Sequence, residues 1–584
     1  MIMKRLYILA FSMAFIAVGK AQNKNTDSKI VDLGVKTTTE ERMTQAVSTI
    51  YSDKLEQNAT TSPYNALYGL LPGLTTLQNT SWGTEKARLN IRGRGSLNGE
   101  APLFVVDGFV RPIEFINLSE IESISVLKDG AATALWGGRG ANGVVLITTK
   151  RGVYEKKDIK VDYKFGLGLP INQPEFADAY TYAQMRNEAL RNDGLLPDMD
   201  EEGFASHANS DLYPDVDWQK EALRNHTTNH QLDILFRGGG KKLRYFTVLN
   251  YKNDMGLLNT KYTDFTDRYN SQMKKYALNL RMNLDVDVSA TTKLKLSMLG
   301  MLRETKRPTT EEAKLFGQIF NTPSAAFPVM TQQHYWGSNN VLQINPIASL
   351  ADVGYYKLNQ RMLQADLRLT QDLSGFVPGL SAEVAVAYDN SATYQESGKK
   401  SFMYQTISKG ENNEAVYHTF GNAKDELKIS NGGLANQFIH ANFEAKVNYL
   451  HSWDKHHFTA SGMFRHESVV LTGANNTRYR QYINGMWGYN YDNRYMVDVV
   501  TGCFGTSVLK KNDKYRFYPA VSAAWVLTSE KFMKDVDFVD FMKVRASYGR
   551  SGFDTYDYNM DKQYWIGSGS YFFGDGNNSA GSSL

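Results

Sequence analysis

The clearest pattern along the chain is a regular alternation of apolar and polar residues that begins after residue 152. Between Tyr276 and Asp287, one set of alternate positions is apolar or aromatic and the other set is polar or charged. Successive side chains of a β-strand point to opposite faces, so this alternation predicts a strand with one apolar and one polar face. The apolar set is Tyr276, Leu278, Leu280, Met282, Leu284 and Val286, and the polar set is Asn279, Arg281, Asn283, Asp285 and Asp287.

The same alternation recurs over 363–369 and 439–449, between loops rich in glycine and asparagine. A soluble β-sandwich also alternates, so a single strand does not decide the class. Here several strands carry polar or charged residues along one whole face, which is typical of a membrane barrel with lipid outside and a polar lumen inside. The long polar stretches 192–218 and 401–431 then fit an extracellular side. Because half of each strand faces water, this interpretation also explains a mean hydropathy of −0.42.

Residues 52–152 have a different, mixed α/β pattern. Apolar runs bounded by turn residues predict strands over 89–93, 103–106, 121–127 and 144–148. The pair Asp107-Gly108 after the second run predicts a tight turn. Short helices are expected over 63–71, ended by Pro72-Gly73, and over 131–136.

The N-terminus has the layout of a signal peptide. Lys4 and Arg5 precede an apolar run over 6–18, and Ala21 ends a cleavage site of small residues. The run is shorter than the ~20 apolar residues of a membrane-spanning helix, and no cysteine follows Ala21 to accept a lipid. The mature chain is therefore expected to begin at Gln22 and to lie outside the cytoplasm.

A polar stretch over 22–29, whose composition predicts disorder, precedes a short apolar patch. An isolated extended segment of this type can add as a strand to the sheet edge of a partner protein. An ordinary first strand of the following domain fits the patch equally well, and both interpretations stay open. The patch consists of Ile30, Val31, Asp32, Leu33, Gly34 and Val35.

Composition narrows the class of protein further. The 584 residues carry a formal net charge of +4 with both signs mixed, so no basic stripe points to nucleic acid as a partner. Aromatic residues make up 12% of the chain, which suits many strands. The single cysteine, Cys503, excludes an internal disulfide framework, and we expect it to be a small apolar residue of the wall rather than a nucleophile.

One segment has the spacing of a cofactor motif. Gly138, Gly140 and Gly143 match a dinucleotide-binding loop, but that loop must follow a strand and open a helix, whereas here the order is inverted. We expect these glycines to permit a tight turn with positive φ. The acidic run 198–202 is expected to be a solvated turn rather than a calcium site. No nucleophile elbow, phosphate loop or metal-binding histidine spacing appears, so neither catalysis nor a cofactor or metal is expected.

A long ordered series of motifs spans residues 70–152. It comprises Leu71-Pro72-Gly73-Leu74, Ile91-Arg92-Gly93-Arg94-Gly95-Ser96, Pro102-Leu103-Phe104-Val105-Val106-Asp107-Gly108 and the continuous run from Ile121 to Gly152. This series closely resembles the plug domain of TonB-linked outer-membrane proteins of the SusC/RagA family. The resemblance implies an α/β plug domain inside an antiparallel transmembrane β-barrel. The implied order is a signal peptide over 1–21, a flexible segment with a candidate TonB box over 22–51, a plug over 52–152 and a partial barrel over 153–584.

Shorter landmarks at 345–346, 489–495, 518–525 and 543–549 continue the resemblance into the barrel. The run Gly502-Cys503-Phe504-Gly505-Thr506-Ser507 departs from it, because the family usually has arginine, aspartate, glycine and two serines there. Barrels of this kind use about 22 strands, whereas the residues after Gly152 supply roughly twelve to fourteen. The end, 577–584, is expected to be a polar loop. We therefore expect an incomplete barrel and a chain that is a fragment of a longer gene.

The resemblance implies active import of a nutrient, either an oligosaccharide or an oligopeptide, across the outer membrane. The implied partners are TonB, contacting Ile30 to Val35, a SusD-like surface lipoprotein and outer-membrane lipid. Two alternatives stay open: a siderophore or cobalamin receptor of the same architecture, and a non-transporting surface adhesin or signalling receptor. The charges of the plug motifs are expected to pair within the plug or with the barrel wall. The motif residues singled out are Arg92, Gly93, Arg94, Gly95, Asp107, Gly108, Lys128, Asp129, Arg139, Gly140, Asn142 and Gly143.

Overall fold

The computed structural model describes most of the chain from Ile30 onwards. The described residues are 30–583, apart from 35–36, 58–59, 61, 79–86, 96–98, 100, 172, 263–272, 413, 422–426, 472–476, 510–511, 534–535, 537, 555–564 and 574–575. The expected signal peptide over 1–21, the polar stretch over 22–29 and Val35 lie outside them.

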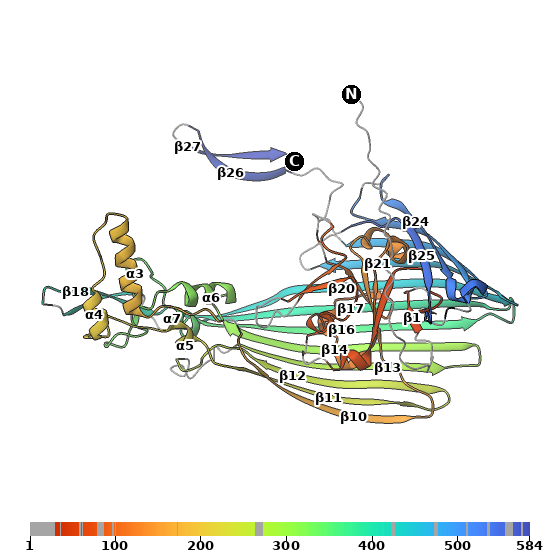
Figure 1. The fold of residues 1–584 in the computed structure, drawn as a ribbon, viewed down its shortest axis with the longest axis horizontal. Coiled ribbons are helices and arrows are strands. Elements are labelled where there is room, and N and C mark those ends of the chain that lie inside the picture. Colours follow the sequence, from red (N-terminus) through yellow and green to blue (C-terminus); the bar gives the residue numbers. More distant parts are fainter. Residues whose placement is uncertain are drawn as a thin grey trace.

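The largest element is a sheet of thirteen antiparallel strands, called the wall here, which curves around the N-terminal part of the chain (Figure 1). Neighbouring strands follow one another along the chain, and the described strands leave the sheet open, with edges at β10 and β25. In order, the strands are β10 Lys157–Gly168, β11 Thr227–Gly239, β12 Leu243–Met255, β13 Lys274–Asp287, β14 Thr292–Pro308, β16 Gly354–Asp372, β17 Leu380–Lys399, β20 Lys428–Trp453, β21 His456–Leu471, β22 Arg478–Tyr491, β23 Tyr495–Thr506, β24 Tyr515–Val526 and β25 Lys543–Gly549.

The two faces of the wall are the reverse of those of a soluble sheet. On β13 the polar residues Asn279 and Arg281 are 5% and 2% exposed, whereas Leu278 and Leu280 are 41% and 50% exposed. The same reversal holds on β16 and on β20, where Glu444 is buried and Phe443 is exposed. The predicted alternation is therefore confirmed, with the polar face turned inward and the apolar face turned outward, as in a membrane barrel.

The concave side of the wall holds a compact α/β unit, called the plug here. Its five-stranded sheet has the order β3-β8-β9-β6-β7, in which β6 and β9 are parallel and the other pairs are antiparallel. A hairpin of β4 and β5 and two short helices complete it. The elements are β3 Val47–Tyr51, α1 Ser52–Leu55, β4 Leu74–Leu77, β5 Arg88–Ile91, β6 Leu103–Val106, β7 Phe109–Val110, β8 Ile121–Leu127, α2 Gly130–Thr133 and β9 Val144–Thr149.

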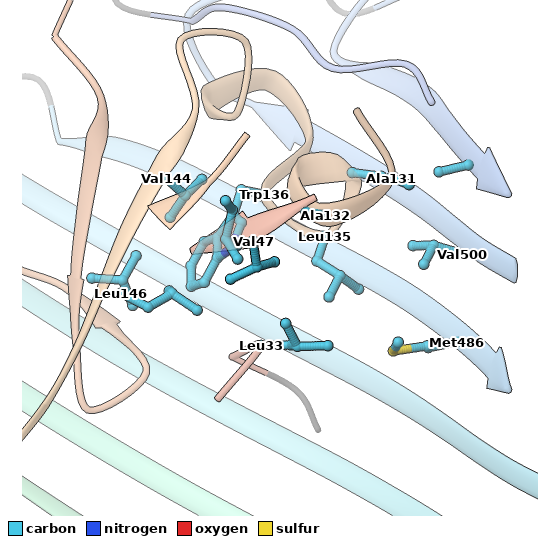
Figure 2. Close-up of a cluster of buried hydrophobic side chains, with 14 of the residues drawn as sticks. Leu33, Val47, Ala131, Ala132, Leu135, Trp136, Val144, Leu146, Met486 and Val500 are labelled. Atoms are coloured by element: carbon cyan, nitrogen blue, oxygen red, sulfur yellow. The ribbon is translucent and has the colours of Figure 1, made fainter. Parts of the chain in front are cut away.

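Two apolar clusters cover the faces of the plug sheet. One is internal to the plug and includes Leu67, Ile124 and Ile147. The other surrounds Trp136 and also takes in wall side chains, and Figure 2 shows Met486 and Val500 beside Leu135 of the plug. The plug thus has a core of its own and also shares apolar contacts with the wall, around Trp136, Phe115 and Phe109.

At one end of the wall, the long connections form a separate layer, called the cap here (Figure 1). Its elements are α3 Ala179–Asn192, α4 Glu201–Ser206, α5 Trp218–Ala222, α6 Glu312–Asn321, β15 Trp336–Ser338, α7 Pro346–Ala351, β18 Met403–Lys409 and β19 Ala415–Gly421. All of these helices except α6 begin at side-chain caps, such as Asp178, which accepts a hydrogen bond from the Thr181 N–H at 2.7 Å, and Asn345, which precedes Pro346. No helix in the described part of the chain is both long and apolar enough to cross a membrane.

Several sequence-based expectations need correction. The end of the chain is not a loop, because β27 Gly576–Ser583 pairs with β26 Trp565–Phe573 in a separate two-stranded sheet. The helix expected over 63–71 is only a short 3-10 turn, Asn65–Leu67, and the helix over 131–136 is α2 followed by a 3-10 segment that is kinked at Gly137. The strand expected over 89–93 ends at Ile91, because Arg92 and Gly93 have positive φ. The expected fold class, an α/β plug inside an antiparallel barrel-type wall, is confirmed, with the wall incomplete.

Candidate functional site at the seam between plug and wall

The contact zone between plug and wall, called the seam here, is built around buried ion pairs. Arg111 follows β7 and reaches two wall carboxylates, with its Nη1 2.7 Å from Asp366 Oδ1 and its Nη2 2.9 Å from Asp389 Oδ1. The three side chains are 2%, 4% and 3% exposed. A guanidinium presents a planar fork of donors, so it can donate hydrogen bonds to two carboxylates at once.

Two further ion pairs join other parts of the plug to the wall. Glu120, directly before β8, accepts from Arg281 Nε of β13 at 2.6 Å, and both side chains are essentially inaccessible. Arg139 donates to Glu467 of β21 at 3.2 Å. A buried ion pair adds little net stability compared with an apolar contact in the same place. Separating its members is costly, however, because each charge would then be buried alone, so these pairs fix the position of the plug.

A second set of seam contacts joins wall side chains to the plug backbone. Asn283 donates to the Lys150 carbonyl at 2.8 Å, and Asn484 donates to the Leu135 carbonyl at 2.9 Å. At the edge strand β25, Arg545 donates to the Gln45 carbonyl at 2.6 Å. Such contacts depend on the plug backbone rather than on particular plug side chains, so sequence motifs do not reveal them.

The Asp107-Gly108 turn, predicted between β6 and β7, lies directly on the seam. Asp107 and Gly108 have φ values of 49° and 92°, which suits the tight turn that an aspartate–glycine pair favours. The Asp107 carboxylate accepts from the Thr149 N–H at 2.9 Å, whereas the Gly108 carbonyl accepts from the wall residue Arg465 at 2.9 Å. Burial alone would raise the pKa of Asp107, but the nearby guanidinium groups of Arg151 and Arg281 lower it below its usual value.

Lys128 and Asp129 order the region where the N-terminal segment enters the plug. Lys128 donates to Ser48 Oγ at 2.5 Å and to the Pro72 carbonyl at 3.1 Å. Burial, together with the positive charges of Arg92 and Arg545, lowers the pKa of Lys128. Asp129 caps α2 by accepting from the Ala132 N–H at 2.8 Å, and it also accepts from Ser547 of β25 at 2.7 Å.

The other motif residues lie in turns of the plug. The Arg92 N–H donates to the Gly73 carbonyl at 2.9 Å, and Arg92 and Gly93 have positive φ, while Arg94 and Gly95 follow in the same loop. Asn142 donates to the Gly99 carbonyl at 3.0 Å.

The glycine motif over 138–143 meets only part of the expectation, because among Gly138, Gly140 and Gly143 only Gly143 has positive φ. The other two are needed for close approach. A Cβ on Gly140 would lie 2.6 Å from the Thr133 carbonyl oxygen, and one on Gly138 would lie 2.5 Å from Phe504 of the wall.

The candidate TonB-contacting segment is ordered as far as it is described. Residues Ile30–Asp32 form β1, which pairs antiparallel with β2, Thr37–Thr39. Val31 and Leu33 are 2% and 3% exposed and belong to the cluster around Trp136. Gly34 has φ 87°, and a Cβ there would lie 3.3 Å from the Trp136 ring. The segment is thus a hairpin strand packed on the plug in this state.

Three seam residues were not singled out from the sequence: Arg111, Glu120 and Arg151. Arg151 donates to Asp285 at 3.0 Å and to Ser297 at 2.7 Å. Each of the three has its partner more than a hundred residues away along the chain, so no local spacing marks them. The available signal was the charge on the inner face of β13, where Arg281 and Asp285 require buried partners.

The acidic run 198–202 is engaged in pairs within the cap. Asp198 accepts from Arg186 at 2.7 Å, and Asp200 accepts from Tyr213 at 2.7 Å. No group of three or more metal-type ligands is placed to hold an ion anywhere in the part of the chain that is described.

The family described as TonB-dependent Receptor Plug Domain matches residues 39–144. The chain is 25% identical to TonB-dependent receptor P26 of Formosa agariphila over 90% of this chain and 53% of that protein. It is 24% identical to TonB-dependent receptor SusC of Bacteroides thetaiotaomicron, also over 90% of this chain and 53% of that protein. The chain therefore spans about half the length of these curated relatives.

Among solved structures, the RagAB peptide importer in its open-open state is similar, with a TM-score of 0.73 and 16% identity. The match covers 95% of this chain and 64% of that one. A plug seated by polar contacts in an antiparallel wall whose polar face is turned inward is the architecture of a TonB-dependent receptor. The family resemblance drawn from the motifs is thus confirmed, and the chain is similar to TonB-dependent receptors of the SusC/RagA type.

Proposed function

We propose that the full-length protein imports a nutrient across the outer membrane, with TonB providing the pull that moves the plug. The observation that carries this proposal is the polar seam. Its main contacts are ion pairs and hydrogen bonds, such as those of Arg111 and Glu120. Contacts of this kind can be exchanged for water when the plug moves, whereas a large apolar interface could not be opened at similar cost.

The nutrient is an oligosaccharide or an oligopeptide delivered by a SusD-like lipoprotein above the cap. The similarity to SusC and to the RagAB peptide importer supports both the partner and the substrate range. The cap at one end of the wall offers a folded surface for such a lipoprotein (Figure 1). Purification from detergent-extracted outer membranes is expected to recover a companion lipoprotein in constant ratio.

The TonB-contacting element proposed here is the segment around β1. Deleting Lys29 to Val35 from the full-length protein is expected to abolish uptake and to leave substrate binding intact. Because Val31 and Leu33 pack on the plug core, binding must be measured on the same preparation to show that the plug is still folded. A deletion of the preceding residues 22–28 is the matched control and is expected to retain uptake. Unchanged uptake after the first deletion would remove this segment from the mechanism.

A further inference from the structure

Strands β23 to β25 of the wall hold a short stretch of the chain just before the plug sheet begins. The stretch runs from Glu40 to Gln45, between β2 and β3, and is called the anchor segment here. Lys543 of β25 donates hydrogen bonds from its Nζ to three carbonyls of this segment. The acceptors are the carbonyls of Glu40 at 2.7 Å, Glu41 at 3.0 Å and Met43 at 3.0 Å. An ammonium group has three donors and no acceptor, so this side chain uses all of its donors on the anchor segment.

The second half of the anchor segment is held by polar side chains of the wall. Thr44 Oγ1 donates to Asp498 Oδ2 of β23 at 2.5 Å and lies 2.8 Å from Ser522 Oγ of β24. The Gln45 side-chain amide donates to the same carboxylate oxygen at 3.0 Å. Arg545 of β25 donates to the Gln45 carbonyl at 2.6 Å. The anchor segment is thus bonded to three consecutive strands of the wall.

The two halves of this contact differ in how easily water replaces them. Glu40 and Glu41 are exposed and Lys543 is half-buried, so water can bond both the carbonyls and the ammonium group once they separate. Thr44 and Asp498 are buried, and separating buried polar groups from their partners is costly. The Lys543 contact therefore opens first, and the buried contact resists longer.

The anchor segment lies between the candidate TonB-contacting hairpin and the plug sheet. Among the described strands, β1 and β2 pair only with each other, and β3 is an edge strand of the plug sheet that pairs only with β8. A force applied on the N-terminal side reaches the anchor segment before it reaches β3. The wall contacts of the segment therefore bear the force first, and β3 stays paired as long as they hold.

We propose that Lys543 and Arg545 anchor this segment to the wall, so that a pull from the periplasm displaces the β1–β2 hairpin while β3 and the rest of the plug stay seated. The plug moves only after the anchor yields. Both are positioning residues, because they touch the backbone of the anchor segment and act through it. The inference goes beyond the proposed function and rests on it only in taking the pull to come from the N-terminal side.

Hydrogen exchange on the purified full-length protein in detergent tests the anchor without TonB or substrate. The variant Lys543→Met keeps much of the length of the side chain and removes its three donors. A hydrogen bond to a charged group corresponds to about 10-fold in an equilibrium constant, so the Arg42 and Ala46 amides are expected to exchange about 10-fold faster. The Arg42 N–H donates to the Thr39 carbonyl at 3.0 Å, and the Ala46 N–H donates to Asp129 Oδ2 at 2.9 Å. Exchange in β6 and β9 is expected to stay as in the parent protein.

The matched control is Lys531→Met, which removes the same charge from an exposed lysine in the connection between β24 and β25. It is expected to leave exchange in the anchor segment unchanged. Unchanged exchange in Lys543→Met would overturn the anchor. Faster exchange throughout the plug sheet of that variant would also overturn it, because the lysine would then stabilise the plug as a whole.

Single-molecule pulling on the full-length protein in a lipid bilayer measures the force that the anchor bears. With the handle at the N-terminus, the parent protein is expected to release the hairpin first and the anchor in a separate event at higher force. Lys543→Met and Arg545→Met are each expected to lower the force of the second event, and Lys531→Met is expected to leave it unchanged. A second event of unchanged force in the first two variants, or no separate event in the parent protein, would refute the proposal. An intact anchor in a protein that shows no TonB-dependent uptake would uphold the anchor and refute the proposed import.

Discussion

The seam and the cap both bring together segments that lie far apart in the chain. The seam relies mainly on ion pairs and hydrogen bonds, whereas the cap relies mainly on apolar packing. At the seam, the plug meets the wall through ion pairs such as Arg111 with Asp366 and Asp389, together with donors that reach backbone carbonyls. In the cap, connections between different wall strands pack into an apolar cluster around Trp218 and Phe327, whose rings lie 5.3 Å apart in an edge-to-face arrangement, and into a smaller one around Phe204.

The difference follows from what each contact can exchange with water. An apolar cluster is stabilised roughly in proportion to the apolar surface that it buries, so its stability falls gradually as that surface is exposed to water. A buried ion pair adds little net stability but strongly disfavours any position of the plug that separates its members. The seam therefore specifies one seated position, while the cap is held together by its apolar clusters. The seam also contains apolar patches, at Met486 and Val500 (Figure 2) and where Phe115 and Phe109 of the plug pack on the wall.

The largest effect is expected from breaking one seam pair on one side only. Arg111→Ala leaves Asp366 and Asp389 buried without a partner, and such changes cost about 3–5 kcal/mol. We expect the plug amides of β6 to β9 to lose protection by a corresponding amount while the cap amides are unaffected. Hydrogen exchange on the full-length protein in detergent measures both regions in one experiment.

The control for Arg111→Ala removes the charges from both sides. The triple variant Arg111→Met, Asp366→Asn and Asp389→Asn leaves no uncompensated charge, so it is expected to recover most of the lost protection. If the triple variant were as unstable as the single one, the seam would be held by packing rather than by charge, and the contrast with the cap would fail.

A smaller effect, confined to the other region, is expected in the cap. Leu315 of α6 is 1% exposed within the cap cluster, and Leu315→Ala is expected to cost about 2–5 kcal/mol through lost burial and the resulting cavity. Protection should fall in α5 to α7 and not in the plug sheet. The conservative change Leu315→Met keeps the volume and is expected to cost below about 1.5 kcal/mol. Loss of plug protection in Leu315→Ala would show that cap and plug unfold together.

The sequence was informative where structure is set by local pattern. Alternation alone predicted which residues of β13 face inward, because a strand's two faces are fixed by its period. The Asp107-Gly108 turn was predicted for a similar reason, since that dipeptide tolerates positive φ. The pairing of Arg111 with Asp366 and Asp389 was not predictable, because it depends on how two separately folded units sit together. The strand β27 was missed because glycine, serine and asparagine rarely favour a strand.

The smallest effect concerns a single charge at the surface of the cap. Asp200 caps α4 through the Gly203 N–H and also accepts from Tyr213 and Lys409. The Tyr213 hydroxyl, the Gly203 N–H and Lys409 together lower the pKa of Asp200 to about 2. A carboxyl group whose pKa is lower in the folded state stabilises that state above its ordinary pKa of about 3.9, and this contribution is lost as the pH falls from about 4 towards 2. Its side chain is 42% exposed, so solvent screening limits the contribution to about 0.2–1 kcal/mol.

The variant Asp200→Asn keeps a side-chain oxygen at the N-terminus of α4 and removes the charge. Hydrogen-exchange protection of the cap amides should therefore be slightly lower than in the parent protein at pH 6 and equal to it near pH 2. A difference that persisted unchanged at low pH would mean that shape rather than charge holds this corner of the cap.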